Sequence, residues 1–191
     1  MSDRLGKESM PAKTYLSAND LMLDSFRLGK QILDSGWRPD VVLALWRGGT
    51  PISLAVHELL AYCGVMTVHM SMHCRSYTGI GQTGTVTIEH SESVLARLQP
   101  DHNVLVVDDI FDTGNTARNV LELLRPLAAE VRLATLYWKT GTNVTDLRPD
   151  YHVRQTDAWI VFPHEMEGLT RDEIRQKDPT LHRLLFESAH A

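Results

Sequence analysis

One stretch, Val104–Thr116, constrains the fold more than any other part of the chain. It opens with Val104–Val107, whose length and β-branched content are those of a strand buried on both faces. Two adjacent carboxylates, Asp108 and Asp109, follow directly, and a helical pattern runs from Ala117 to Leu127. A buried strand, a short loop and a helix in this order indicate an open α/β sheet, which binds ligands at the carboxyl ends of its strands.

The loop before the predicted helix combines backbone amides that could bind an anion with an acidic side chain. Its residues are Asp112, Thr113, Gly114, Asn115 and Thr116. Free N–H groups and the positive end of the helix dipole attract a phosphate there. Because carboxylates repel a phosphate, we expect the acids to hold hydroxyls, a metal ion or a proton. A helix cap would explain Asp112 alone, but it would leave Asp108 and Asp109 unexplained.

This arrangement resembles the phosphoribosyl-pyrophosphate (PRPP) motif of the type I phosphoribosyltransferases. The resemblance implies that Asp108 and Asp109 engage the ribose hydroxyls, and that residues 113–116 bind the 5-phosphate. It implies that Asp112 is the catalytic general base, which accepts the N7 proton of a purine as N9 attacks. Human-type members often carry lysine where this chain has Asn115, which keeps hydrogen bonding but loses a charge.

A second turn follows the predicted strand Val41–Trp46 and precedes a predicted helix, Ile52–Tyr62. Its glycines allow close backbone approach to a ligand, and the guanidinium of Arg47 suits a pyrophosphate. The turn is similar to the family's pyrophosphate loop, which implies that Arg47 and Gly48 bind pyrophosphate. Packing alone also explains many Gly-Gly turns.

A long loop is predicted from His73 to Thr85, because the segment is rich in Gly, Ser and Thr. Its Ser76-Tyr77 pair resembles the mobile loop of hypoxanthine–guanine phosphoribosyltransferases, which closes over the reacting centre and excludes water. A solvated surface loop is the alternative.

The resemblance also implies a purine site. Lys139, after the predicted strand Val131–Trp138, would donate to the exocyclic oxygen of a 6-oxopurine. Trp159 would stack on the base, and Ile160 would offer its backbone carbonyl to the purine edge. The implied cofactor is Mg²⁺, held by Asp108 and Asp109 and reached by Glu165.

Composition limits the partners. The chain has 191 residues, 43% of them hydrophobic, and a formal net charge of −5, which argues against nucleic acid as the main partner. Two cysteines fit a reducing compartment, and no apolar run approaches the ~20 residues that span a bilayer. The polar start of the chain lacks an apolar signal region, so a cytoplasmic protein without a membrane partner is expected.

Strands alternate with helices, which predicts a mostly parallel, twisted α/β sheet flanked by helices. We expect one phosphoribosyltransferase domain over residues 1–191, with a core at about 38–140 and a small C-terminal hood at about 141–170. Further elements are predicted at Ser17–Leu33 (helix) and at Val65–Met72, Thr85–His90 and Ala158–Phe162 (strands).

The function predicted is purine salvage: transfer of phosphoribosyl from PRPP to N9 of a 6-oxopurine, hypoxanthine first, with guanine and xanthine as alternatives. A homodimer or homotetramer is what the family implies. Two competitors are a non-catalytic PRPP sensor, and a phosphoribosyltransferase for another base. The sensor would lose Asp112, Lys139 or Trp159 and carry a basic face, and an adenine enzyme would have no use for Lys139.

Overall fold

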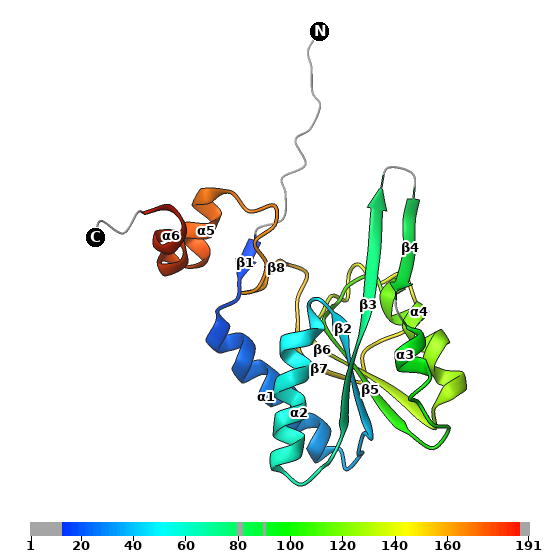
Figure 1. Ribbon diagram of the computed structural model, residues 1–191. Coiled ribbons are helices and arrows are strands. Elements are labelled where there is room, and N and C mark those ends of the chain that lie inside the picture. The colour runs from blue at the N-terminus through cyan, green and yellow to red at the C-terminus, as the bar shows by residue number, and fades with distance from the viewer. Residues whose placement is uncertain (1–12, 80–81, 90, 188–191) are drawn as a thin grey trace. The chain divides into compact units, whose positions relative to one another are not determined.

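The strand that ends in the acid pair, β5, lies inside a six-stranded sheet in the computed structural model of the chain (Figure 1). The structure describes residues 13–79, 82–89 and 91–187. The strand order is β4-β3-β2-β5-β6-β7, and every neighbouring pair is parallel except β3 and β4. The strands are β2 (Val41–Trp46), β3 (Val68–Gly79), β4 (Gln82–Glu89), β5 (Asn103–Phe111), β6 (Glu130–Trp138) and β7 (Tyr151–Gln155). The predicted α/β class with a mostly parallel sheet is confirmed.

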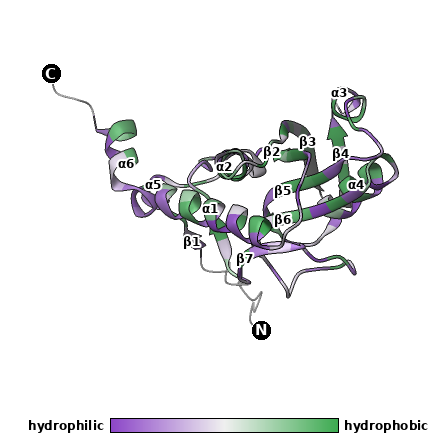
Figure 2. Cartoon of the chain, turned by 90° about the horizontal axis from the view of Figure 1, so that it is seen from below, coloured by the Kyte–Doolittle hydropathy of each residue, from purple (hydrophilic) through white to green (hydrophobic). Residues whose placement is uncertain are grey.

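Helices cover both faces of this sheet (Figure 1). One face carries α1 (Ala18–Asp34) and α2 (Gly49–Tyr62), and the other carries α3 (Glu92–Leu95) and α4 (Asn115–Leu124), which continues into the 3-10 turn η1 (Arg125–Leu127). Figure 2 shows hydrophobic residues concentrated along β5 and β6 between these layers. Parallel sheets of this kind are buried on both sides, which is why their strands are apolar throughout.

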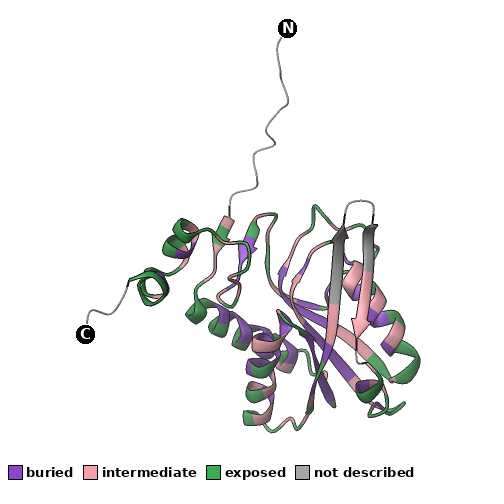
Figure 3. Cartoon of the chain, turned by 45° about the horizontal axis from the view of Figure 1, so that its top comes forward, coloured by how far each residue is buried: buried purple, intermediate pink, exposed green. Residues whose placement is uncertain are grey.

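The central strands form the core (Figure 3). All four residues of Val104–Val107 are fully buried, as expected of a strand covered on both faces. On the α4 side, Val104 and Val106 belong to one apolar cluster with Val120 and Leu124. This packing fixes the direction of β5 and therefore the place where its acidic end emerges.

The predicted long loop at residues 73–85 is wrong. β3 continues to Gly79 and pairs antiparallel with β4, with Ser76 opposite Val86 and Tyr77 opposite Thr85. The residues between the two strands, 80–81, lie outside the described part. The predicted strand at residues 85–90 is present within β4 as far as Glu89. It pairs with residues 73–79, which therefore form a strand despite their small and polar composition.

Boundaries elsewhere also differ from the predictions. Helix α4 begins at Asn115 rather than Ala117, because Gly114 adopts a left-handed conformation (φ 83°) that turns the chain directly into the helix. It ends at Leu124 rather than Leu127, since Pro126 cannot donate a hydrogen bond. Strand β7 was not predicted at all.

The described residues divide into two compact units, residues 19–157 and residues 13–18 with 158–187. In the second unit, β1 (Lys13–Tyr15) pairs parallel with β8 (Trp159–Val161), and α5 (Arg171–Lys177) and α6 (Pro179–Phe186) follow. Thr170 and Glu173 form a capping box at the start of α5. Across the described part of the chain, none of the helices has both the length and the apolar character needed to cross a membrane.

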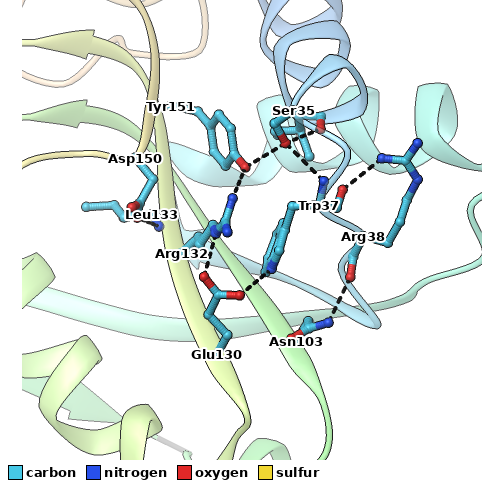
Figure 4. Close-up of polar contacts among 10 residues, drawn as sticks. Ser35, Trp37, Arg38, Asn103, Glu130, Arg132, Leu133, Asp150 and Tyr151 are labelled. Atoms are coloured by element: carbon cyan, nitrogen blue, oxygen red, sulfur yellow. Dashed lines mark hydrogen bonds and ion pairs between the residues drawn. The ribbon is translucent and has the colours of Figure 1, made fainter.

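A polar cluster joins the end of α1 to the amino ends of the strands (Figure 4). The Arg132 guanidinium lies 4.7 Å over the Trp37 ring and donates to Glu130 (2.7 Å) and to the Tyr151 hydroxyl (2.6 Å). Trp37 donates to the same Glu130 carboxylate at 2.7 Å. We refer to Trp37, Glu130, Arg132 and Tyr151 as the Arg132 cluster. It lies where β6 and β7 begin, opposite the strand ends that carry the acids.

Candidate active site

The acid pair lies at the carboxyl end of β5, as predicted. Asp108 and Asp109 are both half-buried, and the Asp109 backbone N–H donates to Oδ1 of Asp108 at 3.0 Å. Burial raises the pKa of Asp108 well above its ordinary value, and the neighbouring Asp109 carboxylate raises it further. A bound cation or hydroxyl donor would relieve the repulsion between the two carboxyl groups.

The turn after β2 fits against the acid pair. A β-carbon at Gly48 would lie 1.9 Å from Oδ2 of Asp109, and one at Gly49 would lie 2.2 Å from the Val107 carbonyl. Both distances are far below any real contact. At Gly49 a side chain would meet fixed backbone, and at Gly48 it would require the Asp109 carboxylate to move. The structure thus brings the predicted pyrophosphate turn directly beside the predicted ribose acids. The roles of Arg47 and Gly48 in binding pyrophosphate remain predictions.

The predicted phosphate loop lies between β5 and α4. The first helical bond runs from the Arg118 N–H to the Gly114 carbonyl at 2.9 Å. The Asn115 N–H points to the Thr113 hydroxyl at 3.4 Å. The backbone amides of this first turn are therefore arranged as in other anion-binding helix starts. A β-carbon at Gly114 would come within 2.3 Å of the Thr145 hydroxyl, so a second segment packs tightly on the loop.

A cavity of about 330 Å³ opens over these elements. It is lined by Leu45, Asp108, Asp109, Ile110, Phe111, Asp112, Thr113, Gly114, Thr116, Ala117, Leu133 and Thr135. The three predicted acids and most of the predicted phosphate loop therefore share one concave site. Asn115, Arg47, Gly48 and Lys139 are not among the residues that line it.

Thr135 is a lining residue that the sequence reasoning missed. It pairs in register with Asp108 across β5 and β6, and it is buried. In the described residues, its hydroxyl has no hydrogen-bond partner. A buried hydroxyl without a partner is unfavourable, so this side of the cavity suits a polar ligand group. Its only sequence signal was a polar residue inside the apolar stretch Leu133–Trp138.

Asp112 is held by two side chains from the segment after β6. Lys139 Nζ donates to Oδ2 of Asp112 at 2.8 Å, and the Thr142 hydroxyl donates to Oδ1. The Lys139 side chain is only 13% exposed, whereas that of Asp112 is 41% exposed. The predicted purine donor and the predicted general base are therefore in direct contact. Thr142 was not predicted.

The topology explains this contact. Phe111 and Trp138 are register partners at the ends of parallel strands, and the Lys139 N–H donates to the Phe111 carbonyl at 2.8 Å. The residues that follow the two strands must therefore meet. If the pairing of β5 with β6 is assumed, the sequence places Lys139 beside Asp112. Strand pairing alone does not determine the position of Thr142, because this position depends on the course of the loop after β6.

The remaining predicted residues belong to the second unit. Trp159 is 48% exposed and Ile160 is buried in β8. Glu165 accepts the Phe162 N–H through Oε2 at 2.9 Å, and its backbone carbonyl accepts from Lys177. That carboxylate therefore stabilises its own turn. The position of these three residues beside the purine remains a prediction.

An acid pair, a helix start with free backbone amides and a Lys–Asp pair therefore meet at adjoining strand ends, an arrangement typical of the ligand sites of α/β enzymes. Comparison with known proteins gives the family. Residues 12–169 match the family model for the phosphoribosyl transferase domain. The chain therefore belongs to the phosphoribosyltransferase family, as the resemblance of residues 108–116 predicted.

Known relatives match between 73% and 90% of the chain. A xanthine-guanine phosphoribosyltransferase from Cereibacter sphaeroides is 30% identical over 185 residues, which cover 90% of this chain and 99% of that protein. A hypoxanthine-guanine phosphoribosyltransferase from Lactococcus lactis is 27% identical, covering 73% and 74% of the two chains. The crystal structure of a purine phosphoribosyltransferase from Pyrococcus horikoshii is similar with a TM-score of 0.65 and 28% identity, covering 83% of this chain and 97% of that chain.

Proposed function

We propose that this protein is a purine salvage enzyme that transfers the 5-phosphoribosyl group of PRPP to N9 of a 6-oxopurine. Hypoxanthine is the first candidate, and guanine and xanthine are the alternatives. The names of the relatives, xanthine-guanine and hypoxanthine-guanine phosphoribosyltransferase, support an oxopurine substrate. These bases differ at C2, so discrimination among them rests on contacts to that edge.

The contact between Lys139 and Asp112 carries the proposal. A 6-oxopurine presents the O6 acceptor and the N7–H donor side by side on one edge. A cation beside a carboxylate is complementary to this edge, because the ammonium can donate a hydrogen bond to O6 while the carboxylate accepts one from N7–H. Adenine presents a 6-amino donor instead of O6, which would face the ammonium without an acceptor.

In the proposed reaction, N9 attacks C1′ of PRPP and a bond forms between them. The bond from C1′ to the pyrophosphate oxygen breaks, and pyrophosphate leaves with the electron pair. Asp112 accepts the N7 proton as positive charge develops on the purine. The amides and hydroxyls of residues 113–116 hold the 5-phosphate, and Arg47 with Gly48 holds the pyrophosphate.

Asp108 and Asp109 fit the implied Mg²⁺, because carboxylate oxygens are the hard ligands that this ion takes together with substrate phosphates. The described residues contain no group of three His, Cys, Asp or Glu side chains that could hold a metal. The two carboxylates alone would leave coordination positions for oxygens of the substrate. Bound Mg²⁺ would neutralise charge on the leaving pyrophosphate. Glu165 would contribute through a water molecule.

The remaining parts of the proposal follow the family resemblance. Trp159 would stack on the base, which is worth about 1–3 kcal/mol, and the Ile160 carbonyl would meet the purine edge. Ser76 and Tyr77 would cover the reacting centre. The protein would act in the cytoplasm as a homodimer or homotetramer.

The test is absorbance-monitored turnover with PRPP and Mg²⁺, with hypoxanthine, guanine, xanthine and adenine offered separately. Nucleotide formation from an oxopurine, lowered at least about 100-fold in Asp112→Asn, would support the proposal. The control is PRPP binding by the same variant, which should persist. PRPP binding without turnover of any purine would overturn the enzyme proposal in favour of a PRPP sensor.

A further inference from the structure

The segment after β6, residues 139–147, is attached to the phosphate loop along its length. The Lys139 N–H donates to the Phe111 carbonyl at 2.8 Å, and the Val144 N–H donates to the Thr113 carbonyl at 3.0 Å. The Thr145 hydroxyl packs against Gly114. The backbone on both sides of Thr142 is thus fixed relative to Asp112, although the Thr142 side chain itself is exposed.

Thr142 and Lys139 each donate a hydrogen bond to a different oxygen of the Asp112 carboxylate. The hydroxyl of Thr142 donates to Oδ1, while the ammonium of Lys139 donates to Oδ2. An aspartate carboxyl group rotates through a broad χ2 range when nothing holds it. Two donors, one on each oxygen, fix both its position and the orientation of its plane.

The purine must disturb one of these bonds. In the proposed reaction, Lys139 turns towards O6 and Oδ2 becomes available for the N7 proton. Thr142 does not compete for the base, so its bond to Oδ1 can persist through the reaction. A carboxylate that is held on one oxygen presents the other in a defined direction, which general-base catalysis requires.

We infer that Thr142 is a positioning residue for Asp112, keeping the proton-accepting oxygen aimed at the purine when Lys139 has moved to the substrate. The inference rests on the proposed function, because it assigns Asp112 the role of general base. A purely structural role would be to fasten residues 139–147 onto the phosphate loop. That role would affect PRPP binding and stability, whereas positioning affects the chemical step.

Three variants separate these roles. Thr142→Val keeps the side-chain shape and removes the hydroxyl, and Thr142→Ser keeps the hydroxyl. Thr140→Val makes the same change at an exposed threonine of the same segment. For Thr142→Val we expect kcat to fall about 10-fold, because the proton-accepting oxygen is less well oriented towards the purine. The KM for PRPP and the melting temperature should match those of the wild type.

Thr142→Ser should recover kcat to within about twofold of the wild type, and Thr140→Val should leave it unchanged. Wild-type turnover with an unchanged kcat in Thr142→Val would overturn the inference alone. A Thr142→Val variant that loses PRPP affinity and melts early would assign the bond to structure and also overturn it. Absence of turnover by the wild type with every purine would instead overturn the proposed function, and the inference with it.

Discussion

The carboxylate of Asp109 occupies the space where a side chain on Gly48 would be. A β-carbon there would lie 1.9 Å from Oδ2 and 2.3 Å from Cγ of Asp109. The turn after β2 and the acid pair after β5 are therefore fitted to each other in the free protein. Because the two strands are parallel neighbours, both parts of the proposed PRPP site depend on this contact.

Gly48→Ala should weaken PRPP binding about 10-fold, which corresponds to about 1.4 kcal/mol. The Gly48 backbone (φ −61°, ψ −39°) is one that alanine adopts readily, so the clash with Asp109 is the only cost. The Asp109 carboxylate can rotate away, and we expect the melting temperature to stay within about 2 °C. Calorimetric titration with PRPP and Mg²⁺ measures the affinity.

The control for this prediction is a double-mutant cycle with Asp109→Ala. If the clash carries the effect, adding Gly48→Ala to Asp109→Ala should change the affinity little further. Additive losses would show that alanine harms the turn independently of Asp109. Wild-type affinity in the single variant would contradict the prediction.

Lys139→Gln should change the base preference. The ammonium is the donor proposed for O6, and it is mostly buried beside Asp112. A glutamine amide is neutral and can present either its carbonyl or its NH₂ group. We expect kcat/KM for hypoxanthine to fall about 100-fold, with a smaller loss for adenine. Steady-state kinetics with both bases give the ratio.

PRPP affinity is the control, because Lys139 has no proposed contact with PRPP. An unchanged ratio between hypoxanthine and adenine would remove Lys139 from base recognition. It would leave only its ion pair with Asp112 as a role.

The Asp108 carboxyl group should make the free protein less stable as pH rises. Its pKa is raised in the folded protein, so the folded state keeps a proton at pH values where the unfolded chain has released it. The free energy of unfolding therefore decreases from the ordinary carboxyl range upwards through the raised pKa. Asp108→Asn cannot ionise, although its amide oxygen can still accept the Asp109 N–H.

The variant should therefore be more stable than the wild type at high pH, by on the order of 1 kcal/mol. The difference should vanish at low pH, where Asp108 is protonated. Urea unfolding at several pH values, without PRPP or Mg²⁺, measures this. If the free energies of unfolding of the two proteins changed in parallel with pH, the raised pKa of Asp108 would be contradicted.

The sequence predicted the parts of the fold that depend on burial. Val104–Val107 had to be a buried strand, and the acids after it had to lie at a sheet edge. Local chemistry set the features that were missed. Gly114 starts α4 two residues early through its positive φ. Residues 73–79, of loop-like composition, form a strand by pairing with β4.

The site was predictable only in its linear motifs. Asp108, Asp109 and Asp112 could be recognised because they are close in the chain. Thr135 and Thr142 could not, because each acquires its position from strand pairing or from the course of a loop. An isolated threonine carries no signal of a neighbour that lies far away in the sequence. The fit of Gly48 to Asp109 was hidden for the same reason.

The last prediction concerns the Arg132 cluster, at the opposite end of the sheet from the site. Arg132→Lys should lower the melting temperature by about 2–4 °C. Lysine cannot stack as a planar group on Trp37 while donating to both Glu130 and Tyr151. The kcat and the KM for PRPP should be unchanged, because the cluster lies where the strands begin. Arg125→Lys, at an exposed arginine of η1, is the matched control and should melt like the wild type. Thermal unfolding and steady-state kinetics on the same samples test this prediction. A loss of activity without a loss of stability would contradict it, and would mean that the Arg132 cluster influences the candidate active site.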